Sequence, residues 1–180
     1  MALSAVLAVT ERDVQIKTPD GTCDAAFIYP TTGSYPGVLI WTDAFGLRPS
    51  MREMGRQLAA EGYSVLVPNP FYRVAKSPVF EDASKLVFQE IRPKIMPLMG
   101  SVTASGAAEK DAVAYIGFMD AQPEVDKAKK VGTQGYCMGG ALVVRTIGGG
   151  PRARGCRGVV PWRRACDGCA EQPTSACAED

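Results

Sequence analysis

The stretch Gly135-Tyr136-Cys137-Met138-Gly139-Gly140 decides the fold of this chain. A candidate strand at residues 130–136 leads into this stretch, and a candidate helix begins after it at residues 141–147. A tight strand-to-helix turn that exposes a nucleophile needs small residues two places before and two places after that nucleophile. Gly135 and Gly139 occupy those places around Cys137. The pattern predicts a nucleophilic thiol at Cys137, and the alternative interpretation is a buried structural cysteine at a glycine-rich turn.

The rest of the pattern alternates between candidate strands and candidate helices. Residues 13–18 and 23–29 alternate in polarity around a Pro-Asp-Gly turn, as two paired strands do. GVLIW at 37–41 and SVLV at 64–67 are short apolar runs, typical of parallel strands that are covered on both faces. Residues at helical spacing indicate one helix through Met51, Met54 and Leu58, and another at 107–119 through Ala112, Val113, Ile116 and Met119. This order predicts an α/β fold, a three-layer sandwich with a mostly parallel sheet.

The loop after the strand at 37–41 contains the second part of the candidate site. It reads Thr-Asp-Ala-Phe-Gly-Leu, residues 42–47. An elbow nucleophile uses an oxyanion hole made by the N–H of the next residue and an N–H from a loop after an earlier strand. We expect these two donors at Met138 and Ala44. Asp43 is expected to bring a carboxylate near Cys137, and the alternative is that it caps a helix or a turn.

Taken in order, these blocks resemble the dienelactone hydrolase family over about residues 13–147. The matching stretches are DG at 20–21, PGVLIWTDAFGL at 36–47, QLAAEGYSVLVPNPFYR at 57–73 and VGTQGYCMGGA at 131–141. The resemblance implies an α/β-hydrolase fold that hydrolyses small esters or lactones without a cofactor, with Cys137 as the nucleophile. It implies oxyanion N–H groups at Ala44 and Met138, and it places Asp43 where the family usually has a glutamate that contacts the thiol. The block at 57–73 ends in Tyr-Arg, as similar blocks of the family do, and we assign no role to Arg73.

Composition limits the chemistry and the partners. The 180 residues contain no histidine, so a Ser-His-Asp or Cys-His triad cannot be completed within them, and we expect impaired hydrolysis. Twenty basic and nineteen acidic side chains leave a net charge of +1, which favours no nucleic-acid partner. No apolar run is long enough for a membrane span, and the first ten residues lack the basic flank of a secretory signal. The expectation is a cytoplasmic protein with a small-molecule ester or lactone as its partner.

The composition changes sharply at Gly148. Residues 148–180 are rich in Gly, Arg, Ala and Cys and contain no Leu, Ile, Phe, Tyr, Met or Lys. We therefore divide the chain into residues 1–147, the N-terminal part of a dienelactone-hydrolase-like domain, and an atypical tail at 148–180 that is expected to be irregular. A back-translation of residues 159–180, shifted by one nucleotide, yields a family-like run, so the tail resembles a frame-shifted segment.

A domain truncated after the elbow helix would leave the strand at 130–136 at the edge of the sheet. Exposed edges favour pairing with another chain, so self-association through this edge is expected. Two alternatives to an impaired hydrolase remain. One is a non-catalytic, truncated hydrolase fragment, and the other is a cysteine-rich metal-binding module built on Cys166 and Cys169 with Cys156 and Cys177.

Overall fold

The computed structural model describes residues 6–80, 87–148 and 158–159. The regular elements of these ranges are, in chain order, β1 (Val9–Thr18), β2 (Gly21–Pro30), β3 (Gly37–Trp41), α1 (Pro49–Ala60), β4 (Ser64–Pro68), α2 (Phe88–Thr103), α3 (Ala107–Asp120), β5 (Gly132–Gly135), α4 (Met138–Gly148) and β6 (Gly158–Val159). The strands and helices expected from the sequence are all present. No helix in the described ranges combines the length and the apolar character needed to span a membrane.

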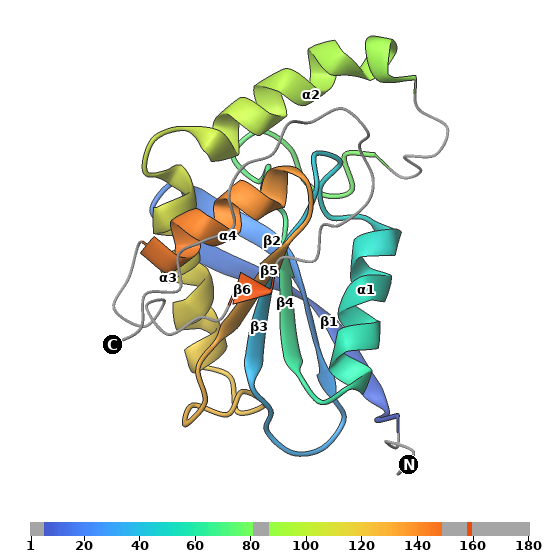
Figure 1. Cartoon of the computed structure of the whole chain (residues 1–180), viewed down its shortest axis with the longest axis vertical. Helices are drawn as coiled ribbons and strands as arrows, with labels where there is room; N and C mark the ends of the chain where they lie inside the picture. The colour runs from blue at the N-terminus through green and yellow to red at the C-terminus, as the bar shows by residue number, and fades with distance from the viewer. Residues whose placement is uncertain (1–5, 81–86, 149–157, 160–180) are drawn as a thin grey trace.

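The strands of the described residues form one mixed sheet in the order β1-β2-β4-β3-β5-β6 (Figure 1). The pairs β1–β2 and β2–β4 are antiparallel, and β4, β3, β5 and β6 run parallel to one another. Every residue of β3 and β4 is buried, which explains why their sequences are continuous apolar runs. The predicted α/β-hydrolase architecture is confirmed.

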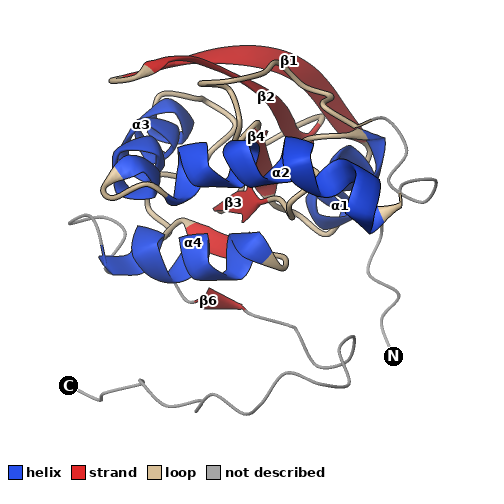
Figure 2. Cartoon of the chain, turned by 90° about the horizontal axis from the view of Figure 1, so that it is seen from above, coloured by secondary structure: helices blue, strands red, loops and turns tan. Residues whose placement is uncertain are grey.

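Helices cover both faces of the sheet (Figures 1 and 2). Successive residues of the two central strands, β3 and β4, belong to the cores on opposite faces. On one face, Val38, Ile40, Val65 and Val67 pack with Met51 and Ala59 of α1. On the other face, Leu39, Trp41 and Leu66 pack with residues of α3 and α4. Since each large apolar side chain that becomes fully buried stabilises the fold by about 1.5–3 kcal/mol, the two layers hold the sheet rigid at its centre.

Helix α2 has no counterpart among the expected elements. It contains Pro93 and Pro97 in its interior, and proline inside a helix removes a backbone hydrogen bond. Its buried residues nevertheless recur at helical spacing, at Ile91, Ile95, Leu98 and Val102. The helix crosses the carboxyl-terminal ends of β3 and β4, above the region where the candidate site residues lie (Figures 1 and 2).

The core face of α3 differs from the expected one at Val113. That residue was assigned to the apolar stripe, but its side chain points outward and is 58% exposed. Asp111 lies on the buried face instead, fully enclosed. A carboxylate is tolerated there because Tyr72 and Arg73 both donate hydrogen bonds to it.

The prediction that the elbow strand is an edge of the sheet was wrong. Residues Gly158–Val159 form β6 inside the segment expected to be irregular, and they pair with Thr133 and Gln134 of β5. The backbone of β5 thus has a parallel partner on each side, β3 and β6. Cys156, Cys166, Cys169 and Cys177 lie outside the described residues.

Candidate active site

The turn between β5 and α4 has the geometry of a nucleophile elbow. Strand β5 ends at Gly135 and helix α4 begins at Met138, so two residues complete the reversal. Cys137 has φ of 51°, in the left-handed region that a residue with a Cβ seldom adopts. Its thiol is free and exposed, whereas the side chain of Met138 is buried in the core. The elbow therefore presents the sulfur to solvent and anchors the next residue inside the protein.

The two glycines predicted to flank the nucleophile are required by close backbone contacts. A Cβ built on Gly139 would lie 2.5 Å from the carbonyl oxygen of Trp41 and 2.7 Å from that of Thr42. A Cβ built on Gly135 would overlap the carbonyl group of Gly139 and approach Val143 to 2.9 Å. By contrast, a Cβ on Gly140 would meet no atom within 4 Å. Gly135 and Gly139 thus leave no room for a side chain, whereas Gly140 does. This is the pattern of an elbow in close contact with the neighbouring strand.

The sheet register brings the loop at 42–47 next to this elbow. Trp41, the last residue of β3, pairs with Gly135, the last residue of β5. The Tyr136 N–H then donates to the Trp41 carbonyl at 3.3 Å. The buried Trp41 indole N–H also donates to the Thr146 hydroxyl of α4 at 2.8 Å. Because the parallel strands end side by side, Asp43 and Cys137 each lie two residues beyond the same register pair.

Within the described ranges, some backbone N–H groups around the elbow have an acceptor and others, such as that of Cys137, have none. The Gly139 and Gly140 N–H groups donate to the carbonyls of Tyr136 and Cys137 at 2.8 and 3.1 Å. In the loop, the Gly46 N–H donates to the Asp43 carbonyl at 3.1 Å. Within the ranges that the structure describes, neither the Ala44 N–H nor the Met138 N–H has an acceptor. These two donors are the ones that the sequence assigned to an oxyanion hole.

Asp43 is engaged within its own loop. Its carboxylate accepts two hydrogen bonds from the Arg48 guanidinium, at 2.7 and 2.8 Å, and one from the Phe45 N–H at 3.0 Å. Among the described residues, no hydrogen bond joins this carboxylate to the Cys137 thiol. Sequence reasoning missed Arg48, although an aspartate and an arginine five residues apart across a glycine turn are a usable signal.

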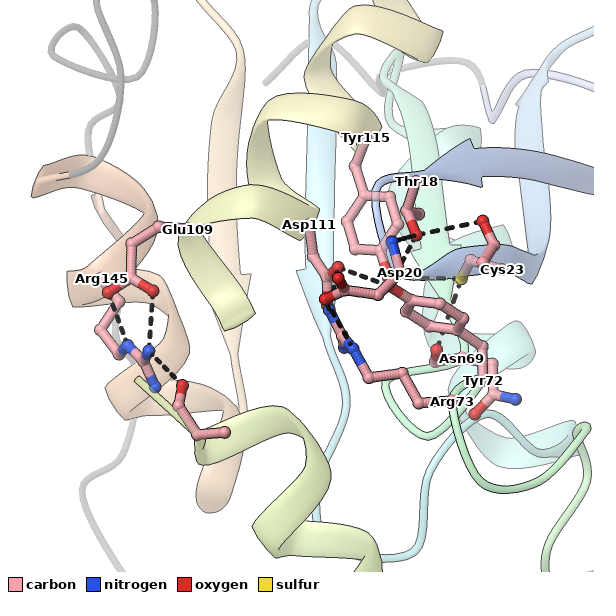
Figure 3. Close-up of polar contacts among 12 residues, drawn as sticks. Thr18, Asp20, Cys23, Asn69, Tyr72, Arg73, Glu109, Asp111, Tyr115 and Arg145 are labelled. Atoms are coloured by element: carbon pink, nitrogen blue, oxygen red, sulfur yellow. Dashed lines mark hydrogen bonds and ion pairs between the residues drawn. The ribbon is translucent and has the colours of Figure 1, made fainter. Parts of the chain in front are cut away.

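Arg73 is bound in a polar cluster with Asp20, Tyr72 and Asp111 (Figure 3). It donates two hydrogen bonds to the buried carboxylate of Asp111, at 2.8 and 2.7 Å, and two to Asp20, at 3.1 and 2.7 Å. Tyr72 also donates to Asp111, at 2.8 Å. Burial raises the pKa of Tyr72, and so do its hydrogen bond to Asp111 and the charge of that carboxylate. The cluster joins the β1–β2 turn, the loop after β4 and helix α3, so Arg73 holds three segments together.

The second described cysteine, Cys23, has a very different environment. It is fully buried on β2, where it contacts the Tyr115 hydroxyl at 3.3 Å and the Asn69 carbonyl at 3.4 Å (Figure 3). Burial raises the pKa of its thiol to about 12. Cys23 is therefore a structural cysteine, and Cys137 is the thiol that solvent reaches.

Comparisons with known proteins agree with this geometry. Residues 23–163 match the dienelactone hydrolase family. The chain is 31% identical over 111 residues to a Synechocystis sp. protein that is provisionally named a carboxymethylenebutenolidase, covering 62% of this chain and 42% of that protein. It is 26% identical over 141 residues to the carboxymethylenebutenolidase of Rhodococcus opacus, covering 76% and 48%.

A solved structure extends the likeness to three dimensions. The crystal structure of a dienelactone hydrolase-like promiscuous phosphotriesterase from metagenomic libraries superposes with a TM-score of 0.59 and 28% identity, over 77% of this chain and 54% of that one. The chain spans less than half the length of the two curated relatives. With the family matched over most of the sequence, the chain belongs to the dienelactone hydrolase family.

Proposed function

We propose that this chain acts on small esters or lactones through a cysteine nucleophile, Cys137. The observation that carries the proposal is the strained and exposed Cys137, with φ of 51°, between two glycines that tolerate no side chain. A residue held in a sparsely populated backbone region at the start of a helix is a recurrent feature of catalytic sites. The names of the matched relatives support the same substrate class.

The proposed reaction begins with attack of the Cys137 thiolate on the ester carbonyl carbon. A C–S bond forms, and the carbonyl electron pair moves to oxygen, giving a tetrahedral oxyanion. The unpaired N–H groups of Ala44 and Met138 are suited to donate to that oxygen, and the positive end of the α4 dipole favours the charge. The oxyanion then collapses, the C–O bond to the leaving group breaks, and a thioester acyl-enzyme remains. This chemistry requires no cofactor.

The missing histidine is expected to slow acylation, because a histidine would also take the proton of the Cys137 thiol. It is expected to slow release of the acyl group even more. Water must be deprotonated as it attacks the thioester, and a general base matched to neutral pH contributes about 10²–10⁴ in rate. The sequence contains no histidine to take that role. We therefore expect acylation to be faster than deacylation, so that the chain as it stands is an impaired hydrolase.

The test is a p-nitrophenyl acetate assay with rapid mixing. We expect a slow burst of at most about one p-nitrophenolate per chain, as acyl-enzyme accumulation produces, followed by negligible turnover. Cys137→Ala should abolish the burst, and Cys23→Ala should keep it because Cys23 is buried away from solvent. Sustained turnover that depends on Cys137 would contradict the expected impairment.

Absence of a burst from the folded wild-type chain would instead favour the alternative of a non-catalytic hydrolase fragment. Stoichiometric zinc in the purified protein would favour the metal-binding module, whose cysteines lie outside the described residues. A cytoplasmic location stays a prediction. Self-association also stays a prediction, but not through β5, which has a partner strand on each side, and size-exclusion chromatography tests it.

A further inference from the structure

Asp43 and Arg48 form a bidentate ion pair in the loop beside the elbow. Two parallel hydrogen bonds join the guanidinium to both carboxylate oxygens, at 2.7 and 2.8 Å. Both side chains are largely enclosed, 10% and 18% exposed for Arg48 and Asp43. A bidentate pair of this kind fixes the orientation of both groups, which a single hydrogen bond does not.

The pair closes the loop that carries Ala44. The same guanidinium donates to the Gly46 carbonyl at 3.2 Å, and the Asp43 carboxylate accepts the Phe45 N–H at 3.0 Å. The Gly46 N–H returns to the Asp43 carbonyl. The Asp43 carbonyl and the Phe45 N–H on either side of Ala44 are thus bound inside the turn, whereas the Ala44 N–H has no acceptor among the described residues.

Arg48 also fastens this loop to the framework. It is the residue before helix α1, and its carbonyl accepts the N–H groups of Met51 and Arg52 at 3.0 and 3.1 Å. Its guanidinium lies over the Phe45 ring, 5.4 Å from the centroid, and Phe45 meets the buried Phe80 edge to face at 5.8 Å. The loop is therefore held by charge on one side and by aromatic packing on the other.

We infer that Arg48 is a positioning residue of the oxyanion hole: by binding Asp43 and the Gly46 carbonyl, it fixes the turn that presents the Ala44 N–H to the reacting carbonyl. The inference rests on the proposed thiol acylation. It gives Asp43 a different role from contact with the thiol, since both of its oxygens are occupied within the loop.

The experiment compares two reactions of the same thiol. Acylation by p-nitrophenyl acetate builds an oxyanion, whereas alkylation by iodoacetamide displaces iodide and builds none. Both rates are measured on Arg48→Met, Arg48→Lys and Arg56→Met, with circular dichroism and thermal unfolding to confirm that each variant is folded. Arg56 is the matched control, because it is an ion-paired arginine on α1, the helix that follows Arg48, and is bound to Glu11 and Glu53.

Loss of one oxyanion donor costs about 10²–10³ in rate, and misplacement by about 1 Å costs up to about 10². Arg48→Met should therefore lower the burst rate by about 10- to 100-fold and change the alkylation rate by less than about 3-fold. Arg48→Lys should have a higher burst rate than Arg48→Met, because lysine keeps the positive charge. Its burst rate should stay below that of the wild type, because lysine cannot form the second parallel hydrogen bond to Asp43. Arg56→Met should leave both rates near those of the wild type.

Each other outcome overturns a distinct claim. An unchanged burst rate in folded Arg48→Met contradicts the positioning role alone. Equal losses in the burst rate and the alkylation rate would show that Arg48 acts on the thiol rather than on the oxyanion. This result would also contradict the positioning role. A wild-type chain that alkylates at Cys137 but gives no burst contradicts the proposed function, and the positioning role falls with it.

Discussion

The α-carbon of Gly139 lies directly against the carbonyl oxygen of Trp41, so close that a Cβ would come within 2.5 Å of it. This contact joins the start of helix α4 to the end of strand β3, where the backbone register already pairs Trp41 with Gly135. Because the obstructing atoms are backbone, no side-chain rotation can relieve an added methyl group. The position of the elbow therefore depends on the absence of a side chain at residue 139.

Gly139→Ala should destabilise the protein and displace the elbow. Overpacking in a well-packed region costs about 1–3 kcal/mol, and the burst of acylation should be lost as Cys137 moves. Gly140→Ala is the matched control, since a Cβ there meets nothing within 4 Å. As alanine is favoured over glycine in a helix by about 0.5–1 kcal/mol, this variant should be as stable as the wild type or more so. Urea unfolding of both variants measures the difference, and equal stabilities would contradict the contact.

The two described cysteines should differ strongly in reactivity. With a pKa raised to about 12, only about one in 10⁴ Cys23 thiols is ionised at pH 8, and burial blocks the reagent as well. The Cys137 side chain is exposed, so the reagent reaches it. Brief iodoacetamide treatment followed by peptide mass spectrometry should show Cys137 labelled at least about 100-fold faster than Cys23. Labelling in guanidinium chloride is the control, and equal labelling of the two in the native protein would contradict the elbow.

Strands β1 to β5 and the elbow could be predicted from the sequence because their signals are local, whereas β6 lies in the segment that was expected to be irregular. The apolar runs of β3 and β4 and the spacing of Gly135 and Gly139 around Cys137 are confined to a few neighbouring residues. Helix α2 could not be predicted, because Pro93 and Pro97 in its interior are a signal against a helix. The helix forms because its apolar side packs on the core. Tertiary packing there overrides local propensity.

The polar partners of the site could not be predicted for a different reason. Arg73 and Asp111 are far apart in the sequence, and nothing in either neighbourhood indicates that the fold brings them together. For the same reason Val113 was placed in the core of α3, where Asp111 lies instead. Asp43 was correctly placed at the end of a strand, but the direction of its side chain depends on the turn that leads to Arg48.

The carboxylate of Asp24 should make stability fall in acid. Burial acts to raise its pKa, but hydrogen bonds from Ser77 and Asn69 outweigh burial and lower it below 3.8. A carboxyl group with a depressed pKa in the folded state stabilises the protein above its unfolded pKa and loses that contribution as pH falls through the folded value. The thermal midpoint should therefore drop on acidification below about pH 4.

Asp24→Asn isolates this contribution. One carboxylate oxygen of Asp24 accepts a hydrogen bond from the Asn69 side chain at 2.9 Å, and the other accepts one from the Ser77 N–H at 2.9 Å. In the variant an NH₂ group replaces one of these oxygens and cannot accept its hydrogen bond. At pH 7 the variant should therefore be less stable. In acid the wild-type carboxyl carries a proton too, so the difference in midpoint should shrink. Thermal unfolding at pH 7, 5, 4 and 3 measures it, and a difference that does not change with pH would contradict the assignment.

The ion pair between Asp111 and Arg73 should be the most costly to break, because Asp111 is fully enclosed (Figure 3). Removal of one partner from a buried pair leaves an uncompensated charge and costs about 3–5 kcal/mol. Asp111→Ala should therefore unfold at much lower urea concentration than the wild type. Asp13→Ala is the control, because Asp13 pairs with Arg52 at the surface and is 77% exposed, where such pairs contribute about 0–1 kcal/mol.

A double variant separates the charge from the volume of these side chains. Arg73→Met with Asp111→Leu removes both charges and keeps apolar bulk, and exchanges of this kind in buried pairs are often neutral or stabilising. We expect it to be more stable than Asp111→Ala, although the double variant also loses the contact with Asp20 and the hydrogen bond from Tyr72. If Asp111→Ala were no more damaging than Asp13→Ala, the cluster would not hold α3 to the β1–β2 turn. If the double variant were the least stable of all, the pair would contribute through its hydrogen bonds rather than through compensation of a buried charge.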